Sequence, residues 1–189
     1  MSDLKDLLFE IGTEELPPQS VRELSNALAN GISAGLDREG LSHGDVTSYA
    51  TPRRLAVVVD ALQSAQEERQ VERRGPAVSA AFDSEGNPTK AALGFAASCG
   101  VEVGHLERLE NKKGQWLAFR TTQMGQSTTS LLPDIAARAA GNLPIKRRMR
   151  WSDKEVEFAR PVHWVVLMFG DELVDATILG VNTGRHTRG

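Results

Sequence analysis

The stretch Val46-Thr-Ser-Tyr-Ala-Thr-Pro-Arg-Arg-Leu-Ala-Val-Val-Val-Asp-Ala-Leu62 decides the fold class of this 189-residue chain. Its second half, Leu55 to Val59, is dense in aliphatic and β-branched residues, which are enriched in strands. Thr51-Pro52 separates the two halves and predicts a bend or bulge, because proline cannot donate a hydrogen bond to a sheet ladder. We therefore expect two strand segments, with Arg53 and Arg54 directly after the bend. We expect this arginine pair to supply a contact rather than core stability; the alternative is that one of them forms a salt bridge to an acid such as Glu10 or Glu14 and fixes the packing.

Further strands are expected on both sides of this stretch. Leu4 to Ile11 is a short apolar run that ends at Gly12. Asn111-Lys112-Lys113-Gly114 and Gly170-Asp171 are turn sequences flanked by apolar segments, which is typical of β-hairpins. The second hairpin should join Val162–Phe169 to Leu173–Leu179. The strands therefore predict a mainly antiparallel sheet.

Apolar residues at spacings of three and four predict about three amphipathic helices. The first should run from a cap at Ser20 to Gly40, the second from Pro88 to Gly100, and the third from about Ser130 to Gly141. Gly31 and Gly35 inside the first helix each cost roughly 1 kcal/mol relative to alanine, which close packing would explain. Helices and strands together predict an α+β module.

The domain organisation follows from length and from one loop-like stretch. A chain of 189 residues is near the usual size of one domain and leaves room for two small subdomains. Residues 77–87 have the composition of a loop, so a boundary between two subdomains is expected near 77–88. The last residues, 183–189, are polar and cationic and do not resemble a domain ending, so we expect the chain to be the start of a longer subunit.

Composition restricts the classes of function. The net charge is −3, but residues 1–48 carry −6 and residues 49–189 carry +3, so an anion-binding role belongs to local patches in the later part. A single cysteine excludes an intramolecular disulfide, and four histidines that are widely separated in sequence argue against a structural zinc site. Without a leader-like or membrane-length apolar run, we expect a cytoplasmic protein that does not bind membranes.

The densest cationic stretch runs from Lys146 to Trp164. Cations beside aromatic rings are suited to RNA phosphates and unpaired bases. The alternative is that Met149, Trp151, Phe158 and Trp164 are core residues on strands whose opposite faces carry the solvated cations. We leave both open and name the following candidates for contact with nucleic acid or a partner protein: Arg53, Arg54, Arg73, Arg74, Lys146, Arg147, Arg148, Arg150, Trp151, Arg160, Arg185 and Arg188.

Familiar catalytic motifs are absent from the sequence. It contains no Gly-x-x-x-x-Gly-Lys-Ser/Thr phosphate loop, no Gly-x-Ser-x-Gly nucleophile turn and no histidine pair spaced for a metal. Glu14 and Glu15 are adjacent carboxylates, but neighbours in an extended segment point to opposite faces, which favours a capping or surface role. The residues themselves therefore predict a non-catalytic, anion-contacting module that binds no cofactor.

Six ordered motifs carry a resemblance to a known family. They are Leu8-Phe9-Glu10-Ile11-Gly12-Thr13-Glu14-Glu15-Leu16-Pro17, Thr51-Pro52-Arg53-Arg54-Leu55-Ala56-Val57, Arg74-Gly75-Pro76, Gly94-Phe95-Ala96, Met149-Arg150-Trp151 and Phe158-Ala159-Arg160-Pro161. In this order they resemble the amino-terminal part of the beta subunit of the bacterial two-subunit glycyl-tRNA synthetase. The resemblance covers nearly the whole chain, from Leu7 to Gly189.

The resemblance implies a division of labour. The family is a heterotetramer of two alpha and two beta subunits that joins glycine to tRNA using ATP, with ATP and Mg²⁺ on the alpha subunit and tRNA binding chiefly on the beta subunit. This chain should then serve tRNA binding and subunit assembly, be inactive alone, and contain no catalytic residue. An alternative is a freestanding editing hydrolase or RNA-binding module acting on tRNA, which as a hydrolase would need a concave pocket with convergent polar groups.

Overall fold

The computed structural model describes residues 3–111, 114–151 and 156–188, which belong to two compact units. Unit 1 spans Met1–Glu67 and Gly125–Gly189, and unit 2 spans Glu68–Met124. Unit 2 is therefore an insertion within the sequence of unit 1. The stretch 77–88, near which the sequence suggested a boundary, lies inside unit 2, because the chain passes between the units near Glu67 and again near Met124.

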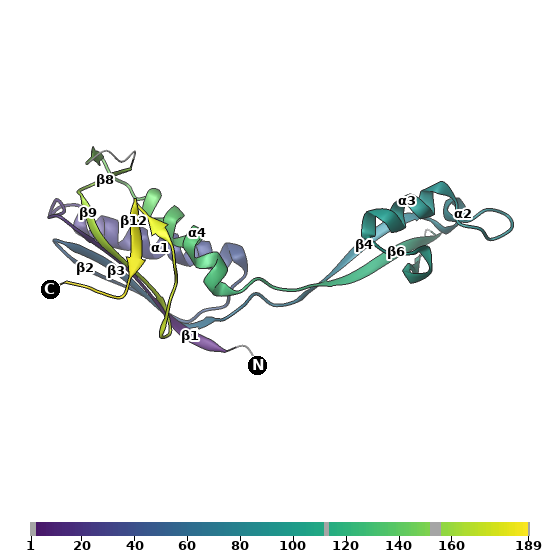
Figure 1. Ribbon diagram of the computed structural model, residues 1–189, viewed down its shortest axis with the longest axis horizontal. Coiled ribbons are helices and arrows are strands. Elements are labelled where there is room, and N and C mark those ends of the chain that lie inside the picture. Colours follow the sequence, from purple (N-terminus) through teal and green to yellow (C-terminus); the bar gives the residue numbers. More distant parts are fainter. Residues whose placement is uncertain (1–2, 112–113, 152–155, 189) are drawn as a thin grey trace. The chain divides into compact units, whose positions relative to one another are not determined.

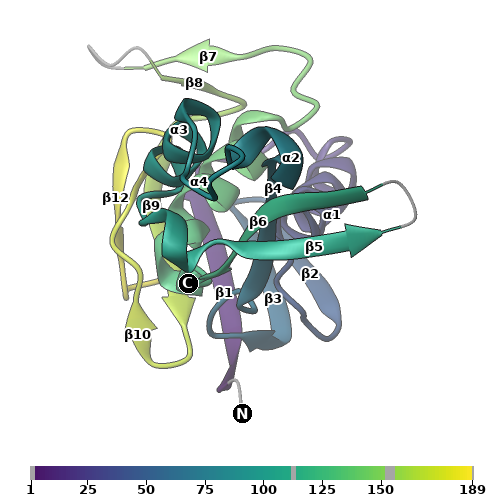
Figure 2. The same cartoon turned by 90° about the vertical axis from the view of Figure 1, so that its right-hand side faces the viewer.

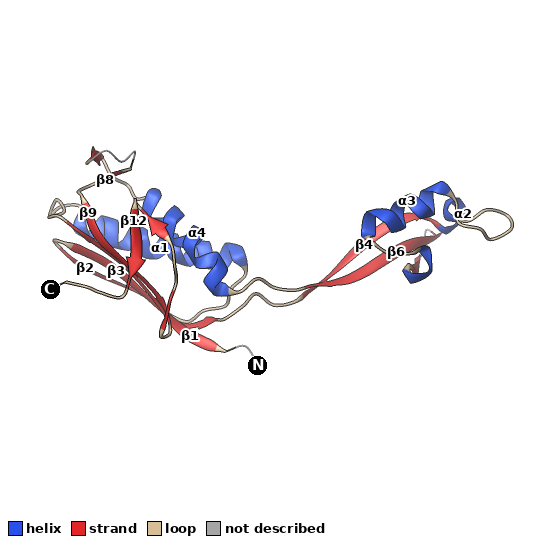
Figure 3. Ribbon diagram, in the orientation of Figure 1, coloured by secondary structure: helices blue, strands red, loops and turns tan. Residues whose placement is uncertain are grey.

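Unit 1 is built on one large sheet (Figures 1 and 3). Its strands lie in the order β11-β12-β9-β1-β3-β2, and β10 also pairs with β9. Every pair is antiparallel except β12 with β9. The bounds are β1 Leu4–Thr13, β2 Val46–Thr51, β3 Arg54–Gln63, β9 Val162–Phe169, β10 Glu172–Leu173, β11 Thr177–Ile178 and β12 Val181–Gly184. The predicted α+β class and mainly antiparallel sheet are confirmed.

Two helices, α1 (Val21–Glu39) and α4 (Thr128–Gly141), cover one face of this sheet (Figure 1). Alternate residues of β1 point into the core below them, and Phe9 and Ile11 are fully buried. Because side chains of a strand alternate between faces, Glu10 and Gly12 lie on the opposite face. The helices thus leave one face of the sheet for other contacts.

The predicted reason for the glycines of α1 is confirmed. A Cβ atom at Gly35 would lie 2.6 Å from Ile135 Cγ2, and one at Gly31 would lie 3.1 Å from Ala139 Cβ, so α1 and α4 approach closely at both positions. The expected start of α4 near Ser130 is wrong by two residues. Ser127 caps the helix by accepting from the main-chain N–H of Ser130, and Pro133 is tolerated inside it.

Unit 2 is a three-stranded antiparallel sheet in the order β4-β6-β5 with two helices beside it (Figure 2). Its elements are β4 Arg69–Ala77, α2 Val78–Ala81, α3 Lys90–Cys99, the 3-10 helix Val103–His105, β5 Glu107–Asn111 and β6 Gly114–Gln123. The predicted hairpin of β5 and β6 is confirmed, although Lys112 and Lys113 of its turn lie outside the described residues. The core of the unit contains Ala81, Ala92 and Leu117.

Two sequence expectations for unit 2 need correction. The stretch 77–87 is not all loop, because α2 forms there and its Ala81 is buried. The next helix begins at Lys90 with Thr89 as its capping residue, not at Pro88, because Pro88 forms a β-bridge with Phe82.

The strand Val162–Phe169 is confirmed as β9, but the other strands expected near the end of the chain are shorter than predicted. The alternation around Met149 and Trp151 yields only β7, Met149–Arg150, paired with β8, Glu157–Phe158. Met149 is 43% exposed, so it is not a core residue, whereas Trp151 packs against the core and Phe158 is fully buried. The segment Leu173–Leu179 is divided between β10 and β11. Among the described residues, no helix is long and apolar enough to cross a membrane.

Candidate nucleic-acid and partner interface

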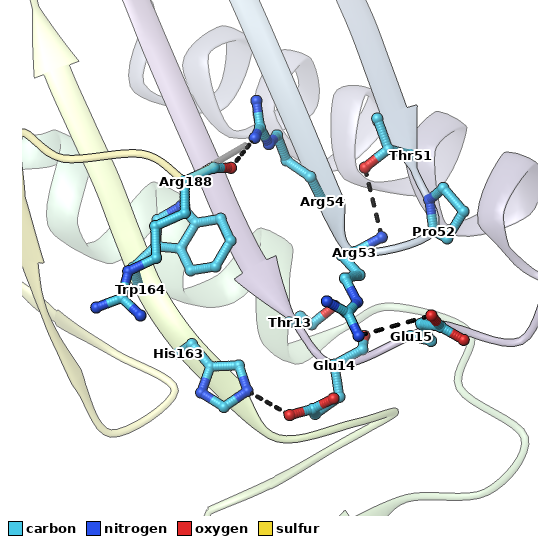
Figure 4. Close-up of a pocket in the computed structure, with 10 residues that line it drawn as sticks. All are labelled: Thr13, Glu14, Glu15, Thr51, Pro52, Arg53, Arg54, His163, Trp164 and Arg188. Atoms are coloured by element: carbon cyan, nitrogen blue, oxygen red, sulfur yellow. Dashed lines mark hydrogen bonds and ion pairs between the residues drawn. The ribbon is translucent and has the colours of Figure 1, made fainter.

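Three segments that are distant in sequence meet where strands of the unit 1 sheet begin or end. Since β1 runs antiparallel to both β3 and β9, the end of β1 lies beside the turn between β2 and β3 and beside the start of β9. They enclose an open cleft of about 850 Å³ (Figure 4). Its lining residues are Thr13, Glu14, Glu15, Thr51, Pro52, Arg53, Arg54, His163, Trp164 and Arg188.

Main-chain hydrogen bonds fix the walls of this cleft. The Thr13 N–H donates to the Arg53 carbonyl at 2.9 Å, and the Leu16 N–H donates to the Pro52 carbonyl at 2.7 Å. On the other side, the Glu14 N–H donates to the Pro161 carbonyl at 3.0 Å. The segment after β1 is thus held between two of the other motif segments, which gives the charged side chains a defined backbone.

A buried carboxylate contacts two of the residues that line the cleft, Trp164 and Arg54. Glu10 is only 6% exposed and accepts a hydrogen bond from Trp164 Nε1 at 2.7 Å and another from the Thr187 hydroxyl. Arg54 Nε lies 3.8 Å from Glu10, and its guanidinium also donates to the Arg188 carbonyl. Burying a carboxylate is costly without such partners, so this cluster holds the residues after β12 against the sheet.

Gly12 is required by the close approach of Trp164. A Cβ atom on Gly12 would lie 2.0 Å from Cε2 of the indole ring, far inside contact distance. The ring therefore packs directly against the β1 backbone, which orients its N–H toward Glu10. This contact explains a glycine near the end of a central strand, where the residue otherwise weakens the sheet.

The rim of the cleft carries charges of both signs. Arg53 is 64% exposed and lies 3.6 Å from Glu15, while His163 Nε2 lies 2.8 Å from Glu14 Oε1 (Figure 4). Pairs this exposed contribute little to stability, about 0–1 kcal/mol. Of the two alternatives for the arginine pair, Arg54 follows the structural one, because it pairs with the buried Glu10, whereas Arg53 is exposed and only weakly paired. The surface role expected for Glu14 and Glu15 agrees with their positions.

Two further hollows continue from the cleft. Arg53 lines the first hollow together with Arg160 and Met149. Arg160 also lines the second, of about 370 Å³, which contains Lys146 and Arg147. Arg160 is fixed in place because its Nε donates to the Glu15 carbonyl at 3.0 Å. Six of the candidate cations, Arg53, Arg54, Lys146, Arg147, Arg160 and Arg188, therefore line one connected series of hollows.

The other candidates of unit 1 are arranged differently. Arg148 donates to the Gly141 carbonyl at 2.9 Å and so satisfies the end of α4. Arg150 and Arg185 are exposed, and Trp151 is half-buried against the core. Arg148 and Trp151 therefore support the fold, whereas Arg150 and Arg185 are available for contact.

Both candidates of unit 2 make contacts within that unit. Arg73 donates to the Ser98 carbonyl at 2.9 Å, at the end of α3. The Arg74 guanidinium lies 3.9 Å from the centre of the Trp116 ring, a cation–π contact. These contacts give both arginines a structural role, and Arg120, whose pKa is raised by its hydrogen bond to Glu72, adds a further ion pair on β6.

Sequence reasoning named Glu10 only as a candidate ion-pair partner of the arginine pair, and it missed His163 as a lining residue of the cleft and Thr187 as a hydrogen-bond partner of Glu10. Glu10 lies within the first motif and His163 follows the last one, but only the pairing of β1 with β9 brings their strands side by side. Among the described residues, no three His, Cys, Asp or Glu side chains gather in a way that could hold a metal ion.

Comparison with known proteins agrees with the motifs. The sequence model of the family described as glycyl-tRNA synthetase beta subunit matches residues 7–189. The glycine–tRNA ligase beta subunit of Edwardsiella ictaluri is 52% identical over 96% of this chain and 26% of the relative. That of Tolumonas auensis is 52% identical and that of Hahella chejuensis 50% identical, each over 98% of this chain and 27% of the relative. The chain thus spans about a quarter of the length of these relatives.

Proposed function

Because this chain belongs to the glycyl-tRNA synthetase beta subunit family, we propose that it supports ATP-dependent attachment of glycine to tRNA through tRNA binding and subunit assembly. The observation that carries this proposal is the connected series of hollows lined by six cations on unit 1. An RNA backbone is a row of phosphates, which exposed cations at the rim of the cleft would neutralise, and the other cations are available to a partner subunit.

The RNA contact is assigned to the cleft of Figure 4. Arg53 and Arg188 are both exposed at its rim, and the half-buried Trp164 of β9 lines the same cleft. The weak pairing of Arg53 with Glu15 can be exchanged for a phosphate at little cost. Such contacts position the RNA but do not read its sequence.

The chemistry of adenylate formation is assigned to a partner alpha subunit, in a cytoplasmic assembly of two alpha and two beta subunits. ATP and Mg²⁺ would bind that partner, and the present chain would form no glycyl-adenylate by itself. The beta subunit name of the relatives supports a partner subunit. Glycine-dependent exchange of pyrophosphate with ATP by this chain alone would contradict the assignment.

The RNA contact is tested by measuring tRNA affinity as a function of salt concentration. The protein is the ligase assembled from the alpha subunit and a beta subunit that carries this sequence. Arg53→Ala and Arg188→Ala should each lower the magnitude of the salt slope by about 0.7 to 0.9, without changing which tRNA is preferred. Arg38→Ala is the matched control, because Arg38 is exposed on α1 and lies outside the cation-lined hollows.

Assembly is measured in parallel by sedimentation. Unchanged salt slopes in an intact assembly would reject the RNA contact. Unchanged slopes together with a lost alpha subunit would instead assign the cleft to the subunit interface.

A further inference from the structure

The hollow at the start of α1 differs in chemistry from the cleft of Figure 4. It lies between the residues that begin α1 and the segment that follows α4, and has a volume of about 370 Å³. It is lined by Pro17, Ser20, Leu24, Pro144, Ile145, Lys146, Arg147, Ala159 and Arg160.

The charge of this hollow is not balanced. Three cations, Lys146, Arg147 and Arg160, line it, and no carboxylate does so among the residues that the structure describes. Within the same described ranges, neither Lys146 nor Arg147 forms an ion pair. The cleft of Figure 4 instead contains Glu14 and Glu15 beside its arginines. The hollow is therefore the stronger anion site of the two.

The walls of the hollow are aliphatic. Leu24, Pro144, Ile145 and Ala159 form them, and none of the described lining residues is aromatic. RNA that is bound through unpaired bases stacks on aromatic rings, which this hollow does not offer. A peptide that carries a carboxylate next to an aliphatic side chain matches both the cations and the walls.

We propose that this hollow binds an acidic, aliphatic-bearing peptide segment of the partner alpha subunit and so anchors the two subunits to one another. The proposal rests on the proposed function, which supplies the partner, and it deepens that function by naming the chemistry of the contact. Arg160 is held by the Glu15 carbonyl at the rim, while the exposed side chains of Lys146 and Arg147 close on the carboxylate.

The test is isothermal titration calorimetry, in which purified alpha subunit is titrated into the beta subunit that carries this sequence and the affinity between them is measured. The double variant Lys146→Ala/Arg147→Ala should weaken the affinity for the alpha subunit roughly thirtyfold or more. Pro144→Asp, which adds a competing carboxylate at an exposed wall position, should weaken it in the same direction. Arg38→Ala is the matched control: it removes an exposed cation on α1 outside the hollow and should change the affinity less than about threefold.

Circular dichroism of each variant establishes that the fold is retained, and the tRNA salt slope is measured on the same proteins. Weaker alpha binding with an unchanged salt slope supports the proposal. Unchanged alpha affinity overturns it, and an accompanying loss of salt slope would assign the hollow to RNA. The RNA contact is tested with variants of Arg53 and Arg188, and the alpha-subunit contact with variants of Lys146 and Arg147. Failure of one proposal is therefore distinguishable from failure of the other.

Discussion

Replacing Gly12 by alanine should disrupt the contact between Glu10 and Trp164, which lines the cleft. The added Cβ would lie 2.0 Å from Cε2 and 2.1 Å from Cδ2 of Trp164, and two fused-ring atoms cannot move aside independently. The whole indole must shift, which breaks its 2.7 Å hydrogen bond to Glu10. The perturbation therefore combines overpacking with the loss of a partner for a buried carboxylate.

The magnitude follows from these two effects. Overpacking costs typically about 1–3 kcal/mol, and a hydrogen bond to a charged group is worth about 1.5–3 kcal/mol. Together they predict a loss of roughly 3–5 kcal/mol, which is a large part of the roughly 5–15 kcal/mol that stabilises a domain. The loss should be confined to unit 1, because all three residues belong to it.

Hydrogen exchange of the β1 and β9 amides measures the free energy of opening of unit 1 directly. Gly184→Ala, in β12 of the same sheet, is the matched control, because a Cβ at Gly184 would meet no atom within 4 Å. This control should change the free energy of opening very little. In a Trp164→Ala background the cost of Gly12→Ala should fall below about 1 kcal/mol, because the ring is gone. A Gly12→Ala variant within about 0.5 kcal/mol of the parent would refute the reasoning.

Three other predictions concern packing, charge and pH. Gly35→Ala should destabilise unit 1 by about 1–2 kcal/mol, because the clash with α4 exceeds the gain in helix propensity. Gly141→Ala, which has open space around its Cβ, should instead stabilise unit 1 by up to about 1 kcal/mol. Denaturant titration measures both changes in the free energy of unfolding, and equal effects would contradict the packing argument. Arg54→Ala should cost about 2 kcal/mol in the same assay because it leaves a buried carboxylate without its cation, and a change below about 0.5 kcal/mol would show the pair to be dispensable. The main-chain N–H of Asn87 donates to Asp83 and lowers the pKa of that carboxyl below its ordinary 3.8. The stability that Asp83 contributes is therefore present above pH 3.8 and is lost as the pH falls through the lower pKa of the folded state. A midpoint at or above 3.8 in an NMR titration of this carboxyl would disprove the prediction.

Elements with a strong local signal were predicted well from the sequence. The β2–β3 turn at Pro52 and the end of α1 at Gly40, with φ +67°, both follow from properties of single residues. The packing reason for Gly31 and Gly35 was also accessible, because a glycine inside an amphipathic helix needs a neighbour that excludes a side chain.

The parts that were missed depend on pairing between distant segments. Nothing local to Glu10 indicates that Trp164 and Thr187 donate to it, since these residues are more than 150 positions apart. The alternation at Met149 was compatible with a half-buried strand, but β8, its strand partner among the described residues, is two residues long, so tertiary context decided its exposure. The candidate site was therefore predictable as a set of cations but not as a cleft.

The roles of the cleft and of the hollow at the start of α1 are tested most directly by arginine footprinting. An arginine-modifying reagent is applied to the beta subunit that carries this sequence, alone, with the alpha subunit, and with the alpha subunit and tRNA, and modified peptides are measured by mass spectrometry. We predict that Arg147 loses reactivity when the alpha subunit binds, that Arg53 and Arg188 lose it only when tRNA binds, and that Arg38 keeps it throughout. Full reactivity of Arg53 and Arg188 in the tRNA-bound ligase would contradict the account.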